Sequence, residues 1–140
     1  MTNGLPDVQP VTEGFAVSPQ LTADDIVRAA AEGVGLVINN RPDDEEAGQP
    51  SSSELAAAAA EAGIGYLHLP VRGGPTESQV AEMRAAVDGA DGTVLAFCRS
   101  GARSIFTWAL GRQAAGTLSR DEVLALARQA GYDLSAHLPR

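Results

Sequence analysis

Residues 93–108 read Thr93-Val94-Leu95-Ala96-Phe97-Cys98-Arg99-Ser100-Gly101-Ala102-Arg103-Ser104-Ile105-Phe106-Thr107-Trp108. An apolar run ends at Cys98, small and cationic residues follow, and an apolar pattern of helical period then resumes. The stretch predicts a strand, a tight loop and the start of a helix. Such a loop points several backbone N–H groups at one place, where the helix dipole favours negative charge. We expect an anion to bind there, beside a Cys98 thiol that loses its proton easily.

Similar patterns alternate along the rest of the chain. The predicted strands cover residues 15–17, 34–38, 64–69 and 93–97, and the predicted helices cover residues 22–33, 51–62, 76–87, 104–115 and 119–130. Four of these helices begin with a serine or threonine followed three residues later by an acidic residue or glutamine, as in a capping box. The alternation predicts a single α/β domain with a mainly parallel central sheet flanked by helices.

The N-terminal residues differ from this pattern. Residues 1–13 are polar and contain prolines, so we expect a flexible arm in front of a domain that covers residues 14–140. Residues 15–17 are expected to form a short strand at the edge of the sheet.

Composition excludes several function classes. The chain has 140 residues, a net charge of −8 and no lysine, which argues against a nucleic-acid or anionic-membrane partner. No apolar run approaches the roughly 20 residues that span a bilayer, and the N-terminus does not resemble a secretory signal. A single cysteine cannot form an internal disulfide. These features predict a cytoplasmic protein; the oligomeric state stays open.

Several candidate residues are expected at one edge of the sheet. In parallel sheets ligands bind beyond the carboxyl ends of the strands, and the loops that follow Ile38 and Phe97 meet there. We assign Cys98 as the nucleophile, Arg103 as the anion-binding cation, and Ser104 as a hydroxyl donor to the thiolate. Further candidates for binding the anion are Arg99, Ser100, Gly101, Ala102 and Arg41, and the candidates for a general acid are Asp43 and Glu45.

Two of these candidates carry more specific expectations. Gly101 is expected to adopt a backbone conformation that a side chain would crowd. Arg99 is expected to face solvent and to select the substrate. His68 lies within a strand pattern and is read as a hydrogen-bonded sheet residue, because no second metal ligand occurs at a usable spacing from it. No metal site and no cofactor are predicted.

Separated motifs carry a family resemblance. The motifs are residues 98–104, 37–42, 48–51, 70–71 and 130–134, and the similarity extends from about Phe15 to Leu134. Together they resemble the bacterial beta-lactamase-hydrolase-like protein, phosphatase-like domain family. The resemblance implies a fold like the dual-specificity protein tyrosine phosphatases, with Cys98 as nucleophile and Arg103 as the anion-binding arginine. It also implies a sulfurtransferase role that is attached to relatives fused to, or encoded beside, sulfur-oxidising hydrolases.

The sequence departs from the tyrosine phosphatase pattern in three ways. Phe97 replaces the histidine before the cysteine, and Arg103 follows Cys98 by five positions instead of six. The loop over residues 72–76 has no aspartate to protonate a leaving alkoxide, a step typically worth about 10²–10⁴-fold in rate. The spacing of cysteine, glycine and arginine is instead that of rhodanese loops.

Three functions stay open at this point. The first is a sulfurtransferase that forms a Cys98 persulfide from an anionic donor such as thiosulfate or polysulfide and passes the sulfur to a thiol such as glutathione. The second is a tyrosine or dual-specificity phosphatase that acts on a phosphate ester through a cysteinyl-phosphate. The third is a module that binds anions or phosphoproteins without turnover.

Overall fold

The computed structural model of the protein describes residue 5 and residues 7–139. Within these residues the strands are β1 (Gln9–Thr12), β2 (Phe15–Ser18), β3 (Val34–Asn39), β4 (Gly65–His68) and β5 (Thr93–Phe97). The helices are α1 (Ala23–Ala31), α2 (Ser52–Ala62), α3 (Glu77–Gly89), α4 (Ala102–Ala115) and α5 (Arg120–Gln129). No helix of this described part is long and apolar enough to cross a membrane.

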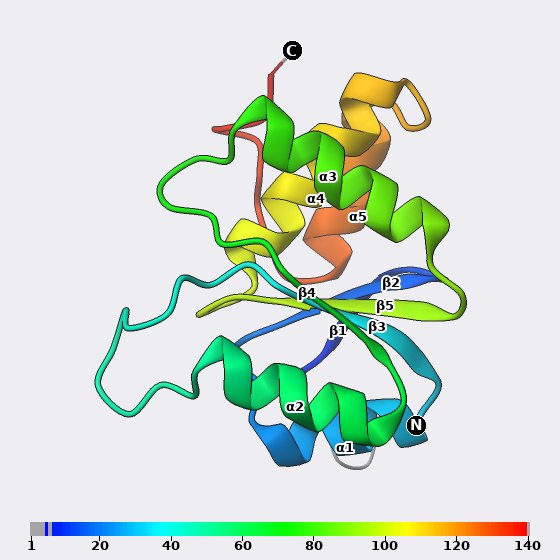
Figure 1. The fold of residues 1–140 in the computed structure, drawn as a ribbon. Coiled ribbons are helices and arrows are strands. Elements are labelled where there is room, and N and C mark those ends of the chain that lie inside the picture. The colour runs from blue at the N-terminus through cyan, green and yellow to red at the C-terminus, as the bar shows by residue number, and fades with distance from the viewer. Residues whose placement is uncertain (1–4, 6, 140) are drawn as a thin grey trace.

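One sheet joins all the strands in the order β1-β2-β5-β3-β4. The pairs β2–β5, β5–β3 and β3–β4 are parallel, and β1 pairs antiparallel with β2. Phe97, at the end of the central strand β5, lies in register with Ser18 on one side and Asn39 on the other. The chain therefore leaves the sheet at Cys98, between the loops that follow β2 and β3. Figure 1 shows this end of β5 at the left-hand side of the sheet. The expected α/β fold with a mainly parallel sheet is confirmed.

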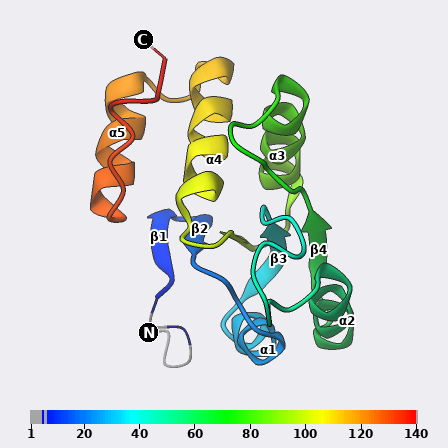
Figure 2. The same ribbon diagram turned by 90° about the vertical axis from the view of Figure 1, so that its left-hand side faces the viewer.

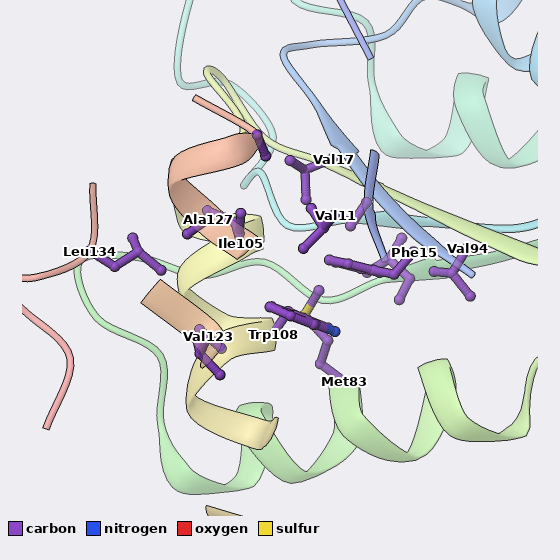
Figure 3. Packing of buried hydrophobic residues seen from close by; sticks show 14 of the residues in the cluster. Val11, Phe15, Val17, Met83, Val94, Ile105, Trp108, Val123, Ala127 and Leu134 are labelled. Atoms are coloured by element: carbon purple, nitrogen blue, oxygen red, sulfur yellow. The ribbon is translucent and has the colours of Figure 1, made fainter. Parts of the chain in front are cut away.

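The helices form a layer on each face of the sheet. In Figures 1 and 2, α3, α4 and α5 lie above the sheet and α1 and α2 lie below it. Each interface has its own apolar cluster. In the upper cluster the rings of Phe15 and Trp108 stack with centroids 5.2 Å apart, and the side chain of Met83 from α3 reaches toward them (Figure 3). Trp108 is thus a core residue that fixes α4 over β2 and β5.

The N-terminal part corrects two expectations. Residues 9–12, within the expected flexible arm, form β1, and Val11 of this strand is buried in the upper cluster. Because β1 takes the edge of the sheet, β2 is an interior strand and all of its residues are buried. Residues 1–4 and 6 of the expected arm lie outside the described residues.

Helix starts follow the capping signals of the sequence. Complete capping boxes open α1 at Thr22, α3 at Thr76 and α5 at Ser119, and at α2 the Ser51 side chain accepts the N–H of Glu54. Helix α4 differs because it begins two residues earlier than expected, and its N-cap is Gly101, with φ +94° and no capping side chain. The first turn of α4 is therefore directly continuous with the loop that follows Cys98.

Candidate active site

Cys98 lies at the bottom of the loop that joins β5 to α4. It is 1% exposed, and the backbone N–H of Gly101 donates to its sulfur, with nitrogen and sulfur 3.1 Å apart. The neighbouring strands hold both ends of this turn: the N–H of Asn40 donates to the Phe97 carbonyl at 2.8 Å, and the N–H of Gln20 donates to the Arg99 carbonyl at 3.4 Å. Sheet order thus positions the thiol and one of its hydrogen-bond donors.

Arg103 extends from the first turn of α4 toward the loop that follows β3. Its two terminal nitrogens donate to the two carboxylate oxygens of Glu45, both at 2.8 Å, and one of them also donates to the Val71 carbonyl at 2.9 Å. The hydrogen bonds that Arg103 donates to Glu45 raise the pKa of Arg103, and the nearby charge of Cys98 adds to this effect. Arg103 is therefore a cation held in place by Glu45 and Val71, and its anion-binding role stays a prediction.

Glu45 does not suit the role of general acid that the sequence suggested. The hydrogen bond from Arg103 lowers the pKa of Glu45 from 4.5 to about 2, with a further contribution from the hydrogen bond of Arg41. At neutral pH this group is a carboxylate without a proton to give. We correct the expectation: Glu45 holds Arg103 in place as an acceptor.

Asp43, the other candidate acid, has a structural partner. Its carboxylate accepts the backbone N–H of Ser52 at 2.8 Å, which satisfies one of the free donors in the first turn of α2. In this structure the Asp43 carboxylate binds the start of α2, and its role as a general acid stays a prediction.

Arg41 is buried beneath the acidic loop over residues 43–48. Its side chain is 2% exposed and donates to Glu45 at 2.9 Å, to Gln20 at 2.9 Å and to Glu46 at 3.3 Å. The expected anion-binding role is therefore corrected: Arg41 anchors the acidic loop and reaches Arg103 through the shared carboxylate of Glu45. The paired charges explain how a guanidinium is tolerated at this depth.

The remaining loop residues divide into buried and exposed groups. Ser104 is fully buried, and its hydroxyl has no hydrogen-bond partner among the residues that the structure describes, so the expected bond to Cys98 is not formed here. The Arg99 side chain is 69% exposed and lies 3.9 Å from Glu46, as expected for a solvent-facing cation. Ser100 and Ala102 are exposed, and the Ala102 N–H donates to the Ser100 hydroxyl at 3.3 Å.

Two residues that contact the loop were not assigned to the site from the sequence. Gln20 follows β2, and its backbone N–H donates to the loop at the Arg99 carbonyl. Its side chain accepts a hydrogen bond from Arg41. Tyr132, after α5, donates its hydroxyl to the Ser100 carbonyl at 2.8 Å. The available signal for Tyr132 was its place in the motif over residues 130–134. The Nε2 of His68, at the end of β4, donates to the Arg41 carbonyl at 2.9 Å, in line with the interpretation of His68 as a hydrogen-bonded sheet residue.

Fold and loop together define a phosphatase-like α/β domain built around a cysteine and an arginine. A crystal structure from Neisseria meningitidis, described as a candidate phosphatase, has a TM-score of 0.81 at 33% identity and covers 93% of this chain and 92% of its own. Tk-PTP has a TM-score of 0.74 at 19% identity, over 95% of this chain and 87% of its own, a likeness that concerns the fold alone. The fold is thus of the protein tyrosine phosphatase type.

The chain belongs to the family described as Beta-lactamase hydrolase-like protein, phosphatase-like domain, whose model matches residues 7–116. A Beta-lactamase hydrolase-like protein from Xylella fastidiosa is 38% identical over 125 residues, which are 89% of this chain and 29% of that protein. The chain therefore spans less than a third of the length of this curated relative. The family resemblance inferred from the motifs is confirmed.

Proposed function

We propose that this domain is a sulfurtransferase that carries sulfur as a persulfide on Cys98. The observation that carries the proposal is the state of the two candidate acids. Glu45 is held as a carboxylate by Arg103, and the carboxylate of Asp43 accepts a helix N–H. The site thus combines a thiol, an N–H donor and a cation with a Glu45 carboxylate that has no proton to give, while Asp43 binds the start of α2.

Sulfur transfer fits such a site because its leaving group needs no proton. In the first step the Cys98 thiolate attacks the outer sulfur of thiosulfate, a new S–S bond forms, and the old S–S bond breaks. Sulfite leaves with the bonding electron pair as a stable anion, next to Arg103. In the second step an acceptor thiolate such as that of glutathione attacks the outer sulfur of the persulfide and regenerates the Cys98 thiolate. No oxidant or reductant is consumed in either step.

Mass spectrometry of the intact protein tests the proposal. After exposure to thiosulfate or polysulfide, Cys98 should gain the mass of one sulfur atom, and an added thiol should remove it. The Cys98→Ser variant should gain nothing. An unmodified cysteine with every sulfane donor would contradict the proposal.

A phosphatase is the second candidate, and the fold favours it. The Neisseria meningitidis structure that matches at 33% identity is described as a candidate phosphatase. This function requires a leaving alkoxide that departs without help from Asp43 or Glu45, so we expect turnover only with activated aryl phosphates. Hydrolysis of such an ester by the same sample, with a trapped cysteinyl-phosphate, would establish it. Sulfate binding without either turnover would indicate a binding module.

A further inference from the structure

Tyr132 reaches the Cys98 loop from a distant part of the chain. It follows α5, whose turn at Gly131 has φ +97°, and its N–H donates to the Ala127 carbonyl at 2.8 Å. The ring packs against the upper apolar cluster, and the hydroxyl donates to the Ser100 carbonyl at 2.8 Å. The end of α5 and the packing of the ring therefore fix the position of the hydroxyl independently of the Cys98 loop.

The Ser100 carbonyl that binds Tyr132 belongs to the same peptide unit as the Gly101 N–H. A peptide bond is planar and trans, so the Ser100 carbonyl and the Gly101 N–H point in opposite directions. The carbonyl is bound by Tyr132, and the N–H donates to the sulfur of Cys98. One hydrogen bond outside the loop thus fixes the orientation of a donor inside it.

Gly101 has the backbone and the space that this arrangement requires. Its φ is +94°, and a Cβ added there would overlap the Tyr132 hydroxyl and lie 3.3 Å from the Ser18 carbonyl. A side chain at residue 101 and the tyrosine hydroxyl cannot occupy these positions together. Gly101 therefore permits the approach of Tyr132 as well as the left-handed turn.

The hydroxyl also keeps the proton it donates. Burial raises the pKa of Tyr132 above its usual value of 10.0, and the charge of Cys98 raises it further. The residue is thus a neutral donor across the pH range in which a cysteine titrates.

We infer that Tyr132 is a positioning residue: by binding the Ser100 carbonyl it aims the Gly101 N–H at the Cys98 thiolate. The inference rests on the proposed function only in taking the thiolate as the reactive form. Without the hydroxyl the peptide is free to rotate, and the thiolate loses a donor that stabilises its charge.

The test is a titration of the Cys98 thiolate by its ultraviolet absorbance, comparing Tyr132→Phe with the unaltered protein. Cys98 is the only cysteine, and the same protein with Cys98→Ser serves as the baseline for each background. One hydrogen bond to a charged group predicts a rise of the titration midpoint by about 1–2 pH units. An unchanged midpoint would overturn the inference.

Tyr66→Phe is the matched control because Tyr66 is the only other tyrosine. Its hydroxyl also makes partly buried hydrogen bonds: it accepts the side-chain N–H of Asn39 at 3.0 Å and pairs with the Ser52 hydroxyl at 2.8 Å. This variant should lower thermal stability without moving the Cys98 midpoint. Equal shifts in both variants would mean a general loosening of the fold and would contradict a specific role for Tyr132.

A second pair of variants tests the contact itself. Gly101→Ala should raise the midpoint and lower stability, because the new methyl group meets the Tyr132 hydroxyl. In the Tyr132→Phe background Gly101→Ala should lower the stability less, because the hydroxyl oxygen that the methyl group would meet is absent. Equal costs in both backgrounds would oppose the inference. These readouts need no sulfur donor, so they can succeed even if persulfide formation, and with it the proposed function, fails.

Discussion

Glu45 shows how one carboxylate can serve two arginines. It accepts from Arg41, which is buried, and from Arg103, which contacts the site, so the position of the anion-binding cation depends on the acidic loop. Because the folded protein lowers the pKa of Glu45 from 4.5 to about 2, this pairing stabilises the fold fully above pH 4.5. The stabilisation is lost as the pH falls toward about 2.

The Glu45→Gln variant should therefore lose stability in a pH-dependent way. We expect its deficit in the free energy of unfolding to be largest near neutral pH, to shrink through the window below pH 4.5 and to vanish near pH 2. Urea unfolding at several pH values measures it. Glu61→Gln, at an exposed position on α2, should change little at any of them. A deficit that persists unchanged at pH 2 would contradict the ion-pair explanation.

Removal of the Arg103 charge should weaken anion binding. Arg103→Ala deletes a charge-assisted donor worth about 1.5–3 kcal/mol, which corresponds to a roughly ten- to hundredfold weaker affinity for sulfate. Calorimetric titration with sulfate at fixed ionic strength measures the loss. Arg99→Ala is the control because that side chain is 69% exposed, and its effect should be much smaller. Equal losses in the two variants would indicate only a general electrostatic effect.

At the scale of elements, the start of α3 is tied to the site. Thr76 and Gln79 exchange hydrogen bonds at 3.1 and 3.0 Å, and the Gln79 side chain also donates to the Pro70 carbonyl at 2.7 Å. Pro70 precedes Val71, whose carbonyl accepts from Arg103. The capping box thus fixes the loop after β4 as well as the helix.

Loss of this cap should be measurable as a loss of stability. Thr76→Ala removes the side-chain acceptor of the Gln79 N–H and should lower the free energy of unfolding by about 1 kcal/mol. Thr76→Ser keeps an acceptor and should retain most of the stability. Urea unfolding of the two variants distinguishes the hydrogen bond from mere loss of side-chain volume; equal losses would argue against the cap.

At the scale of the whole molecule, the sequence predicts the plan of the domain better than the contacts at its site. Local signals suffice for β2 to β5, for the four capped helices and for the edge of the sheet at which Cys98 lies. The pairing of Glu45 with Arg103 joins residues 58 positions apart. It depends on sheet order, which places β5 beside β3, and alternating patterns do not determine that order. Gln20 contacts the loop because the sheet order places β2 beside β5, and Tyr132 contacts it because α5 packs over the sheet; neither arrangement follows from local patterns.

The N-terminal limit of the domain is hardest to predict from the sequence, because residues 9–12, which form β1, have no strong strand pattern. Residues 9–12 contain a proline and polar residues, yet pairing with β2 buries Val11 to 6% exposure beneath α5 and the upper cluster. If this strand belongs to the domain, Val11→Ala removes two buried carbon atoms and should cost about 1.5–3 kcal/mol. The same substitution at Val27, which is 53% exposed on α1, should cost almost nothing. Urea unfolding measures the change in the free energy of unfolding for both variants. Changes near zero in both would mean that residues 9–12 are a flexible arm, whereas a larger loss for Val11→Ala would extend the folded domain to β1.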